Sequence, residues 1–329
     1  MKKMTFILAC LTMAALSANA QMSKVILQHQ GNVTMYEPDD IQTAITAAQD
    51  GDSVLLNTGE FPGFTIDRII SVIGAGTGTK ITSNIAIAIP NKPTLTANIL
   101  EGLNVKDYVS ISINKPVNGL KIKKCTFYSI SFSGIVNNVL IDRCKINKGG
   151  VILSEYVESL DIKNSQVDHV EGDTKTNEPV VKCINCYLDG NPVSPRTGNK
   201  YYSSNSAINF INSWINNYYQ FTIGSNVNTQ QTYHNYYSSK SKYLNCIVKN
   251  QTYGTYDTCW SVYDNDLHSR DIDLLIKDGY VGTDGTVVGE MGGTTPYSLV
   301  TTAPKVTERD IKVSTDMKAL NVNIKVTPN

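Results

Sequence analysis

The sequence predicts an all-β fold in which the short strands of a repeated unit stack in parallel as a solenoid. Three observations predict it. Six eight-residue segments align without a gap, their spacing starts near twenty residues, and charged residues make up only 18% of the chain. A repeat of about that length is typical of solenoids in which each unit adds one coil. Abundant Asn, Ser, Thr and Tyr, together with recurring β-branched residues, favour strands over helices.

The N-terminus is predicted to be a cleaved secretory signal peptide, residues 1–20. Lys2 and Lys3 precede an apolar run that is too short to span a bilayer, and the small residues of positions 18–20 form a cleavage site before Gln21. A lipoprotein site at Cys10 is the rival interpretation, which is disfavoured because few apolar residues precede this cysteine. The mature chain is therefore expected to be secreted, periplasmic or at the cell surface.

Three regions are predicted after the signal peptide. Residues 21–52 supply an N-terminal strand and a cap helix, residues 53–300 supply the parallel strands, and residues 301–329 form a short C-terminal β extension. Both signal lysines are lost from a chain with 29 basic and 29 acidic residues, so the mature net charge is near −2. That balance gives no reason to expect a nucleic-acid partner. No other apolar run approaches the roughly 18 residues of a membrane span, and the oligomeric state is left open.

An amphipathic helix is predicted before the first strands. Its apolar face is formed by residues spaced three and four apart, namely Ile41, Ala44, Ile45 and Ala48. Asp39 or Asp40 is suited to cap its N-terminus, and Gly51 is expected to end it. A solenoid needs its open end covered, and this helix is suited to that role.

The six aligned segments share a chemical character in each column. They read LKIKKCTF (120–127), VLIDRCKI (139–146), LDIKNSQV (160–167), VKCINCYL (181–188), INFINSWI (208–215) and SKYLNCIV (241–248). The sixth column holds only small residues: Cys125, Cys144, Ser165, Cys186, Ser213 and Cys246. The third and eighth columns are apolar throughout, or nearly so. This alternation predicts strands with one buried face.

The CxxC pair Cys183 and Cys186 falls in these buried columns and is interpreted as core. Free cysteine packs as a small hydrophobe, and a zinc site would need a second ligand pair that the four histidines do not supply at a fitting spacing. No metal site is therefore predicted. Cys125 and Cys144 are placed in neighbouring repeats within disulfide reach, and whether they bond is left open. Cys259 is expected to lie outside the columns.

The fifth column predicts a sharp bend between two strands. It contains Lys124, Arg143, Asn164, Asn185, Asn212 and Asn245. Asparagine tolerates the left-handed backbone region, and stacked amides are expected to hydrogen-bond from repeat to repeat. This arrangement resembles the asparagine ladder of right-handed parallel β-helices of the pectin-lyase-like superfamily. Together with the helix of IQxAIxxAxxGD type, it resembles secreted β-helix proteins of Bacteroides-like bacteria, and it implies a right-handed, single-stranded parallel β-helix over roughly residues 36–250.

The repeat is expected to fade beyond residue 250. Residues 278–299, DGYVGTDGTVVGEMGGTTPYSL, resemble the closing segment of bacterial β-helix proteins. Their glycines suit tight turns, and a structural role is preferred to a calcium loop. The last stretch, KVTERDIKVSTDMKALNVNIKV, alternates with period two and predicts two strands with a turn near residues 315–318.

Enzymes of the resembled superfamily cleave acidic polysaccharides by calcium-assisted β-elimination or by hydrolysis with paired aspartates. The sequence lacks the NTD, DD, GHG and RIK motifs of polygalacturonases and the RxPxxR run of pectate lyases. Whether the chain is an enzyme is therefore left open. If it is a polysaccharide lyase or glycoside hydrolase, the candidate catalytic residues are Asp168, His169 and Glu171, with calcium as the cofactor of a lyase. A solvated acidic edge is the alternative interpretation of these residues.

The outward-facing columns become apolar in the last three repeats. The fourth column holds Ile184, Ile211 and Leu244, and the seventh holds Tyr187, Trp214 and Ile247. Soluble monomers rarely expose such a patch, so something is expected to cover it. The inserted segments 189–207 and 216–241, which are rich in Tyr, Asn and Ser, are the predicted cover.

The same residues also suit a ligand-binding cleft, because aromatic rings pack against the C–H faces of sugars. The candidate ligand-binding residues are Tyr187, Trp214, Tyr201, Tyr202, Tyr218 and Tyr219. The leading hypothesis is thus a protein that binds a polysaccharide or other glycan without strong catalysis. The alternatives are an enzyme with an atypical site, and a structural or adhesin-like scaffold that binds another protein.

Overall fold

The computed structural model describes most of the chain after residue 22. The described ranges are 23–89, 99–106, 110–113, 117–153, 157–171, 180–188, 203–204, 208–216, 218–222, 230–234, 236–237, 241–249, 255–262, 272–300, 305–313 and 320–327. The predicted signal peptide lies outside them. Within them the structure is β-rich, and its strands gather in two long, mostly parallel sheets. This agrees with the all-β prediction.

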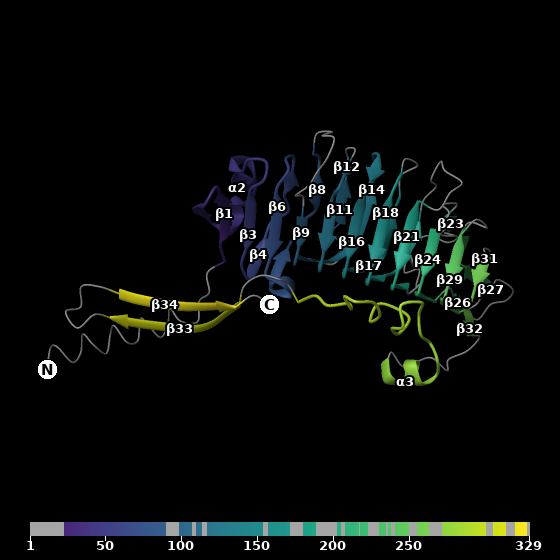
Figure 1. Ribbon diagram of the computed structural model, residues 1–329. Coiled ribbons are helices and arrows are strands. Elements are labelled where there is room, and N and C mark those ends of the chain that lie inside the picture. Colours follow the sequence, from purple (N-terminus) through teal and green to yellow (C-terminus); the bar gives the residue numbers. More distant parts are fainter. Residues whose placement is uncertain are drawn as a thin grey trace.

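The first sheet has 12 strands and extends along the stack from β1 to β31 (Figure 1). All its pairs are parallel except those that β1 makes with β2 and β3. Its order is β2 (Asn32–Tyr36), β1 (Val25–His29), β3 (Ser53–Leu56), β6 (Ser71–Gly74), β9 (Ile99–Glu101), β13 (Lys121–Lys123), β16 (Val139–Asp142), β18 (Leu160–Lys163), β21 (Val181–Ile184), β24 (Ile208–Ile211), β29 (Lys242–Leu244) and β31 (Thr255–Asp257).

The second sheet has 14 strands, and from β3 to β32 each first-sheet strand is followed in the chain by a strand of the second sheet. Its main path is β32 (Trp260–Val262), β30 (Ile247–Lys249), β25 (Trp214–Asn216), β22 (Tyr187–Leu188), β19 (Gln166–Val167), β17 (Lys145–Ile152), β14 (Thr126–Phe132), β10 (Asn104–Val105), β7 (Thr79–Ile81) and β4 (Gly59–Phe61). Beside it lie β5 (Thr65–Ile66), β8 (Ile85–Ile87), β11 (Ser110–Ile113) and β20 (Val170–Glu171). Two short strands, β12 (Val117–Asn118) and β15 (Val136–Asn137), pair separately. We call one first-sheet strand with its following second-sheet strand a rung.

The register of the strands reproduces the predicted columns. Ile122 pairs with Ile141, and Ile141 with Ile162, so the third column is continuous through the first sheet. Side chains of the third, sixth and eighth columns are buried. The fifth column bends as predicted, because every member has a positive φ between 46° and 53°. The members are Lys124, Arg143, Asn164, Asn185, Asn212 and Asn245.

A rung beyond the six aligned segments corrects the prediction that the repeat fades beyond residue 250. Tyr256 pairs with Tyr243, and Trp260 pairs with Ile247, so residues 255–262 form one more rung. Thr258 takes the fifth-column bend with φ 51°. Cys259 therefore occupies the sixth column, and the prediction that it lies outside was wrong. The shortened step of 13 residues from Cys246 hid the match.

The N-terminal end of the stack is covered by the predicted helix. A 3-10 turn, η1 (Pro38–Asp40), leads into α2 (Ile41–Ala47), which buries Ile41, Ala44 and Ile45. Neither Asp39 nor Asp40 caps it through a side-chain hydrogen bond, and the helix ends four residues before Gly51. A second 3-10 turn, η2 (Gly76–Gly78), lies between β6 and β7.

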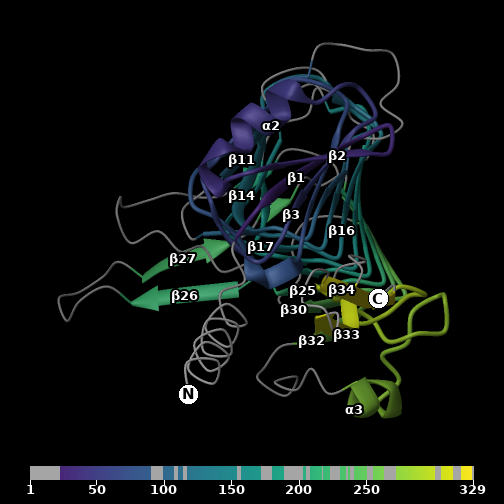
Figure 2. The same cartoon turned by 90° about the vertical axis from the view of Figure 1, so that its left-hand side faces the viewer.

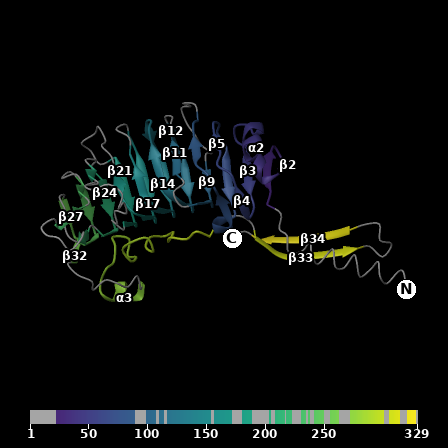
Figure 3. The same cartoon turned by 180° about the vertical axis from the view of Figure 1, so that it is seen from behind.

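The C-terminal part of the chain returns along the stack. After α3 (Ile272–Lys277), residues 278–300 run back toward the end that holds β4 (Figure 3). The two predicted terminal strands are present as β33 (Lys305–Val313) and β34 (Leu320–Thr327), which pair antiparallel. Among the described strands they pair only with each other, and Figure 1 shows them beyond the N-terminal end of the stack.

Candidate functional site

Residues 272–293, which we call the cover segment, cover the seventh-column part of the apolar outer face, which contains Tyr187, Trp214 and Ile247. The fourth-column residues Ile184, Ile211 and Leu244 do not belong to this contact and are half-buried. Trp214 is only 8% exposed beneath the cover segment. The rings of Tyr187 and Trp214 meet edge to face at 5.7 Å, and those of Trp260 and Tyr280 at 5.6 Å. The buried members of this second core are Trp214, Ile247, Leu275, Val287 and Val288. Its cover thus comes from the C-terminal part of the chain, whereas the sequence pointed to the inserted segments.

Asparagines of the fifth column hold the cover segment in place. The Asn164 amide donates to the carbonyl oxygen of Gly292 at 2.6 Å. The side-chain oxygen of Asn212 accepts a hydrogen bond from the backbone N–H of Thr283 at 3.1 Å. The backbone carbonyl oxygen of Asn212 accepts one from the Gly289 N–H at 2.9 Å. Backbone hydrogen bonds join neighbouring rungs along this column, and Thr258 Oγ1 also donates to Asn245 Oδ1 in the last two rungs. The predicted amide-to-amide ladder is therefore replaced, at Asn164 and Asn212, by bonds to the cover segment.

The contact with the asparagines explains why two positions of the cover segment are glycine. A Cβ atom at Gly282 would lie 2.7 Å from Asn212 Cγ, and one at Gly293 would lie 2.3 Å from Asn185 Nδ2. Real Cβ atoms do not approach other heavy atoms so closely. The glycines of this motif therefore allow close contact with the asparagines, in addition to the tight turns that the sequence predicts.

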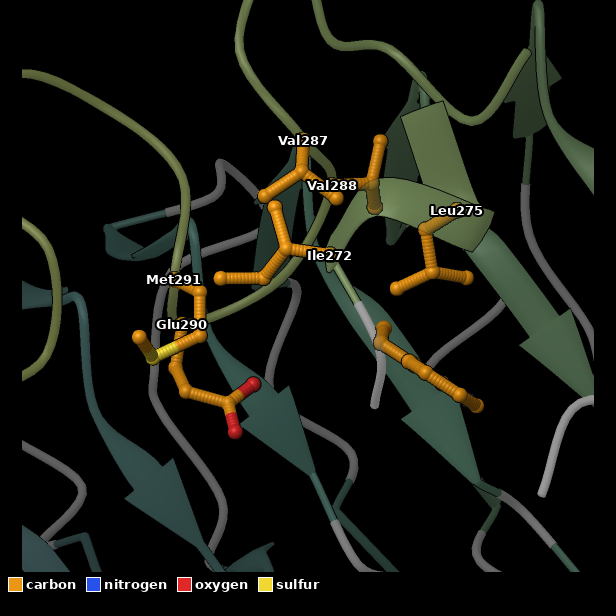
Figure 4. Close-up of a pocket in the computed structure, with 7 residues that line it drawn as sticks. Ile272, Leu275, Val287, Val288, Glu290 and Met291 are labelled. Carbon is orange, nitrogen blue, oxygen red and sulfur yellow. The ribbon is translucent and has the colours of Figure 1, made fainter. Parts of the chain in front are cut away.

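A small pocket remains between the cover segment and the rungs. Its volume is about 10 Å³, which barely admits one water molecule. Figure 4 shows its lining, in which Glu290 is the one charged side chain. Glu290 is 4% exposed and accepts a hydrogen bond from the Gln166 amide at 3.2 Å. The pocket is too small for a sugar ring, so a glycan does not reach Trp214 through it.

The candidate catalytic residues Asp168 and His169 lie together but are buried. His169 Nδ1 is 2.8 Å from Asp168 Oδ2. Asp168 is 6% exposed and His169 is 4% exposed. The Gly150 backbone packs closely on them, since a Cβ there would lie 2.6 Å from the His169 carbonyl oxygen. The side chain of Glu171, in β20, lies outside the described residues. A polymer at the surface therefore does not contact Asp168 or His169 in this structure.

The Tyr-rich insertions form a structure of their own. Tyr218 and Tyr219 begin β26 (Tyr218–Thr222), which pairs antiparallel with β27 (Gln230–His234). The short strands β23 (Ser203–Ser204) and β28 (Tyr236–Tyr237) pair in parallel, so the two insertions are joined. Tyr201 and Tyr202 lie outside the described residues. Figure 2, which looks along the stack, shows the β26–β27 hairpin projecting on the side away from α3.

Sequence reasoning missed this hairpin, although a local signal for it exists. The segments YYQFT and QQTYH contain Tyr, Phe and Thr, which are residues enriched in strands. The interpretation of the insertions was based on their abundance of Tyr and Asn and not on strand signals. The pairing of the two insertions has no local signal, because it joins rungs whose insertions differ in length.

Neither a metal-binding cluster nor a membrane-spanning helix is present among the described residues. They contain no cluster of three or more His, Cys, Asp or Glu side chains able to hold a metal ion. No helix among them combines the length and apolar character needed to cross a membrane.

Comparisons with protein-family models, with curated protein sequences and with solved structures found no significant match to this chain. Function must therefore be inferred from the chain's own residues. The surfaces that remain accessible in the structure carry most weight in that inference.

Proposed function

We propose that this chain is an exported, right-handed parallel β-helix protein of the pectin-lyase-like kind, similar to those of Bacteroides-like bacteria, that binds polysaccharide without strong catalysis. Parallel strands in two sheets, with a left-handed residue between the two strands of each of the last seven rungs, support the β-helix. The right-handed sense follows the strong preference of crossover connections between parallel strands.

The observation that carries the proposed binding is the projecting Tyr-bearing hairpin. Tyr219 and Tyr233 are register partners across β26 and β27. Phe221 lies two positions beyond Tyr219, and strand periodicity places both on one face of the hairpin. Three aromatic positions thus share a face of an element that stands away from the stack. Tyrosine offers rigid amphipathic contact area at low entropic cost, which suits stacking on sugar rings with hydroxyl pairing at the edge.

The buried aromatic residues support this hairpin rather than contact the ligand. Strand β25, which contains Trp214, ends at Asn216, and β26 begins two residues later. Clamping Trp214 under the cover segment therefore anchors the base of the hairpin. In this proposal Tyr187 and Trp214 position the binding element and Tyr219 belongs to the binding surface, while Tyr218 is at a position of the opposite face of the same strand.

The test is retention of the mature chain, residues 21–329, in affinity electrophoresis on plant, host and bacterial polysaccharides, with and without calcium. We expect retardation on at least one polymer, and the Tyr219→Ala variant should weaken it at least tenfold. The matched control is Gln220→Ala, at the neighbouring position on the other face of the same strand, which should bind nearly as the wild type does.

Failure of every polymer to retard the wild type would reject the proposal. So would retention that survives Tyr219→Ala and Phe221→Ala together. The same incubations should be followed for unsaturated and reducing ends, because their release would identify a lyase or hydrolase and return attention to residues 155–178.

A further inference from the structure

Two cysteines meet at the C-terminal end of the stack. Cys246 and Cys259 occupy the sixth column of the last two rungs, and flanking pairs Leu244–Asp257 and Ile247–Trp260 keep them in register. The Cys246 backbone N–H donates to Cys259 Sγ at 3.4 Å. Adjacent strands lie about 4.8 Å apart, within the Cα separation of about 4.4–6.8 Å that a disulfide spans.

The two thiols differ from each other in accessibility and in pKa. Cys259 is half-buried, whereas the other described cysteines, Cys125, Cys144, Cys183, Cys186 and Cys246, are buried. A hydrogen bond from the Cys246 thiol lowers the pKa of Cys259 to about 7, while burial raises the pKa of Cys246 well above its usual value. Cys259 is thus the described thiol that combines access with thiolate character, the requirement for attack on a disulfide.

We propose that Cys246 and Cys259 form a thiol–disulfide exchange site that closes into a disulfide between the last two rungs. The co-reactant is a small-molecule disulfide. The Cys259 thiolate attacks one sulfur of it, forming a mixed disulfide and releasing one thiolate. The Cys246 thiol then loses its proton to solvent and attacks Cys259 Sγ, which releases the second thiolate. Two protein thiols are oxidised, and one small disulfide is reduced to two thiols.

The bond would link the last rung of the stack to its neighbour. Beyond β32 the described chain adds no further rung, so this rung pairs with a neighbour on one side only. A disulfide would hold it covalently to that neighbour. Export, which the signal peptide predicts, leads to an oxidising compartment where such bonds persist.

The test uses the folded mature chain, first reduced and freed of reductant, and an aromatic disulfide that releases a coloured thiolate. We expect two equivalents of thiolate per chain, no retained adduct, and a mass lower by two hydrogen atoms. Peptide mapping should find Cys246 joined to Cys259. The Cys246→Ser variant should release one equivalent and keep the adduct, and Cys259→Ser should release almost none. Serine already occupies this column at Ser165 and Ser213, so both variants should fold.

Cys125 and Cys144 serve as the internal control, because they stack in the same column of neighbouring rungs but are completely buried. Their peptides should stay unlabelled over the time in which Cys259 reacts fully. The proposal would be overturned by an adduct that persists on the wild type, by a lack of reaction, or by equal labelling of the control pair.

Discussion

At the residue scale, the asparagines of the fifth column have two roles. Asparagine tolerates the left-handed corner at each rung, and at Asn164 and Asn212 the amide also binds the returning chain. Glycine at 282 and 293 is the complementary choice, because a Cβ would lie too close to the amide of Asn212 at the first position and to that of Asn185 at the second. The two motifs, far apart in the sequence, are thus two sides of one contact.

Replacement of Gly293 by alanine tests this contact. Gly293 has φ 78° and meets Asn185, while Gly285 has a nearly equal φ of 76° with nothing within 4 Å of its Cβ position. Gly285→Ala should cost about 1 kcal/mol in free energy of unfolding from backbone strain alone. Gly293→Ala should cost about 3 kcal/mol because overpacking is added. Urea unfolding measures both, and equal losses would show that the close approach is unimportant.

The reactivity of Cys259 should follow its pKa. A pKa lowered to about 7 leaves about half of this thiol as thiolate at neutral pH. The alkylation rate of Cys259 should therefore rise about tenfold per pH unit below 7 and level off above it. In Cys246→Ala the hydrogen bond is lost, so the midpoint should move up toward about 8.5. Quantified peptide labelling across pH checks this, and an unmoved midpoint would contradict the assigned cause.

At the scale of elements, the cover segment buries the seventh-column part of the apolar outer face that the sequence predicts. Leu275 of α3 and Val287 with Val288 pack on Trp214 and Ile247. These five side chains exclude water from a surface that would otherwise favour association. The arrangement buries a satellite core outside the main one, and its stability depends on residues that follow the last rung.

Truncation should expose that surface. A chain of residues 21–271 lacks the cover segment, so Trp214 and Trp260 should become solvated, and the protein should bind a hydrophobic dye and lose solubility. Intrinsic fluorescence is a specific probe, because the chain has two tryptophans and both belong to this second core. A red-shifted emission is expected. An unchanged spectrum would mean that the inserted segments cover the face without the cover segment.

At the scale of the whole molecule, stability is distributed along a stack in which each rung contacts its neighbours. Such architectures are stabilised by nearest-neighbour interfaces and need protected ends. The N-terminal end has α2, and the first sheet begins with the antiparallel β1 and β2. The terminal hairpin β33–β34 stands apart from this scheme, because among described strands it pairs only with itself.

Removal of the terminal hairpin should therefore leave the stack intact. A chain of residues 21–300 keeps the whole cover segment, and its thermal midpoint should lie within about 2 °C of that of the full mature chain, since few stabilising contacts are removed. Tryptophan emission should be unchanged, which also makes this chain the control for the 21–271 truncation. A clearly lower midpoint would instead show that the hairpin packs on the stack.

The sequence by itself determined the repeating part of this protein. Strand alternation, the small sixth column and the asparagine corners are local patterns. Neighbouring rungs with the same pattern stack in register because each rung repeats the geometry of the one before it. The rung of residues 255–262 was not predicted, because its step from Cys246 is only 13 residues and polar Ser261 stands in an apolar column.

Only the tertiary structure decided what covers the seventh column of the outer face and that the candidate residues Trp214, Asp168 and His169 are buried. The cover segment meets the rungs through contacts such as Asn164 with Gly292, which are 128 residues apart. No periodic pattern encodes such a pairing, because it depends on where the chain returns after its last rung. The same return buries Trp214, and local packing around Gly150 buries Asp168 and His169. Chemical character can be read along a chain, whereas accessibility is set by residues distant in sequence.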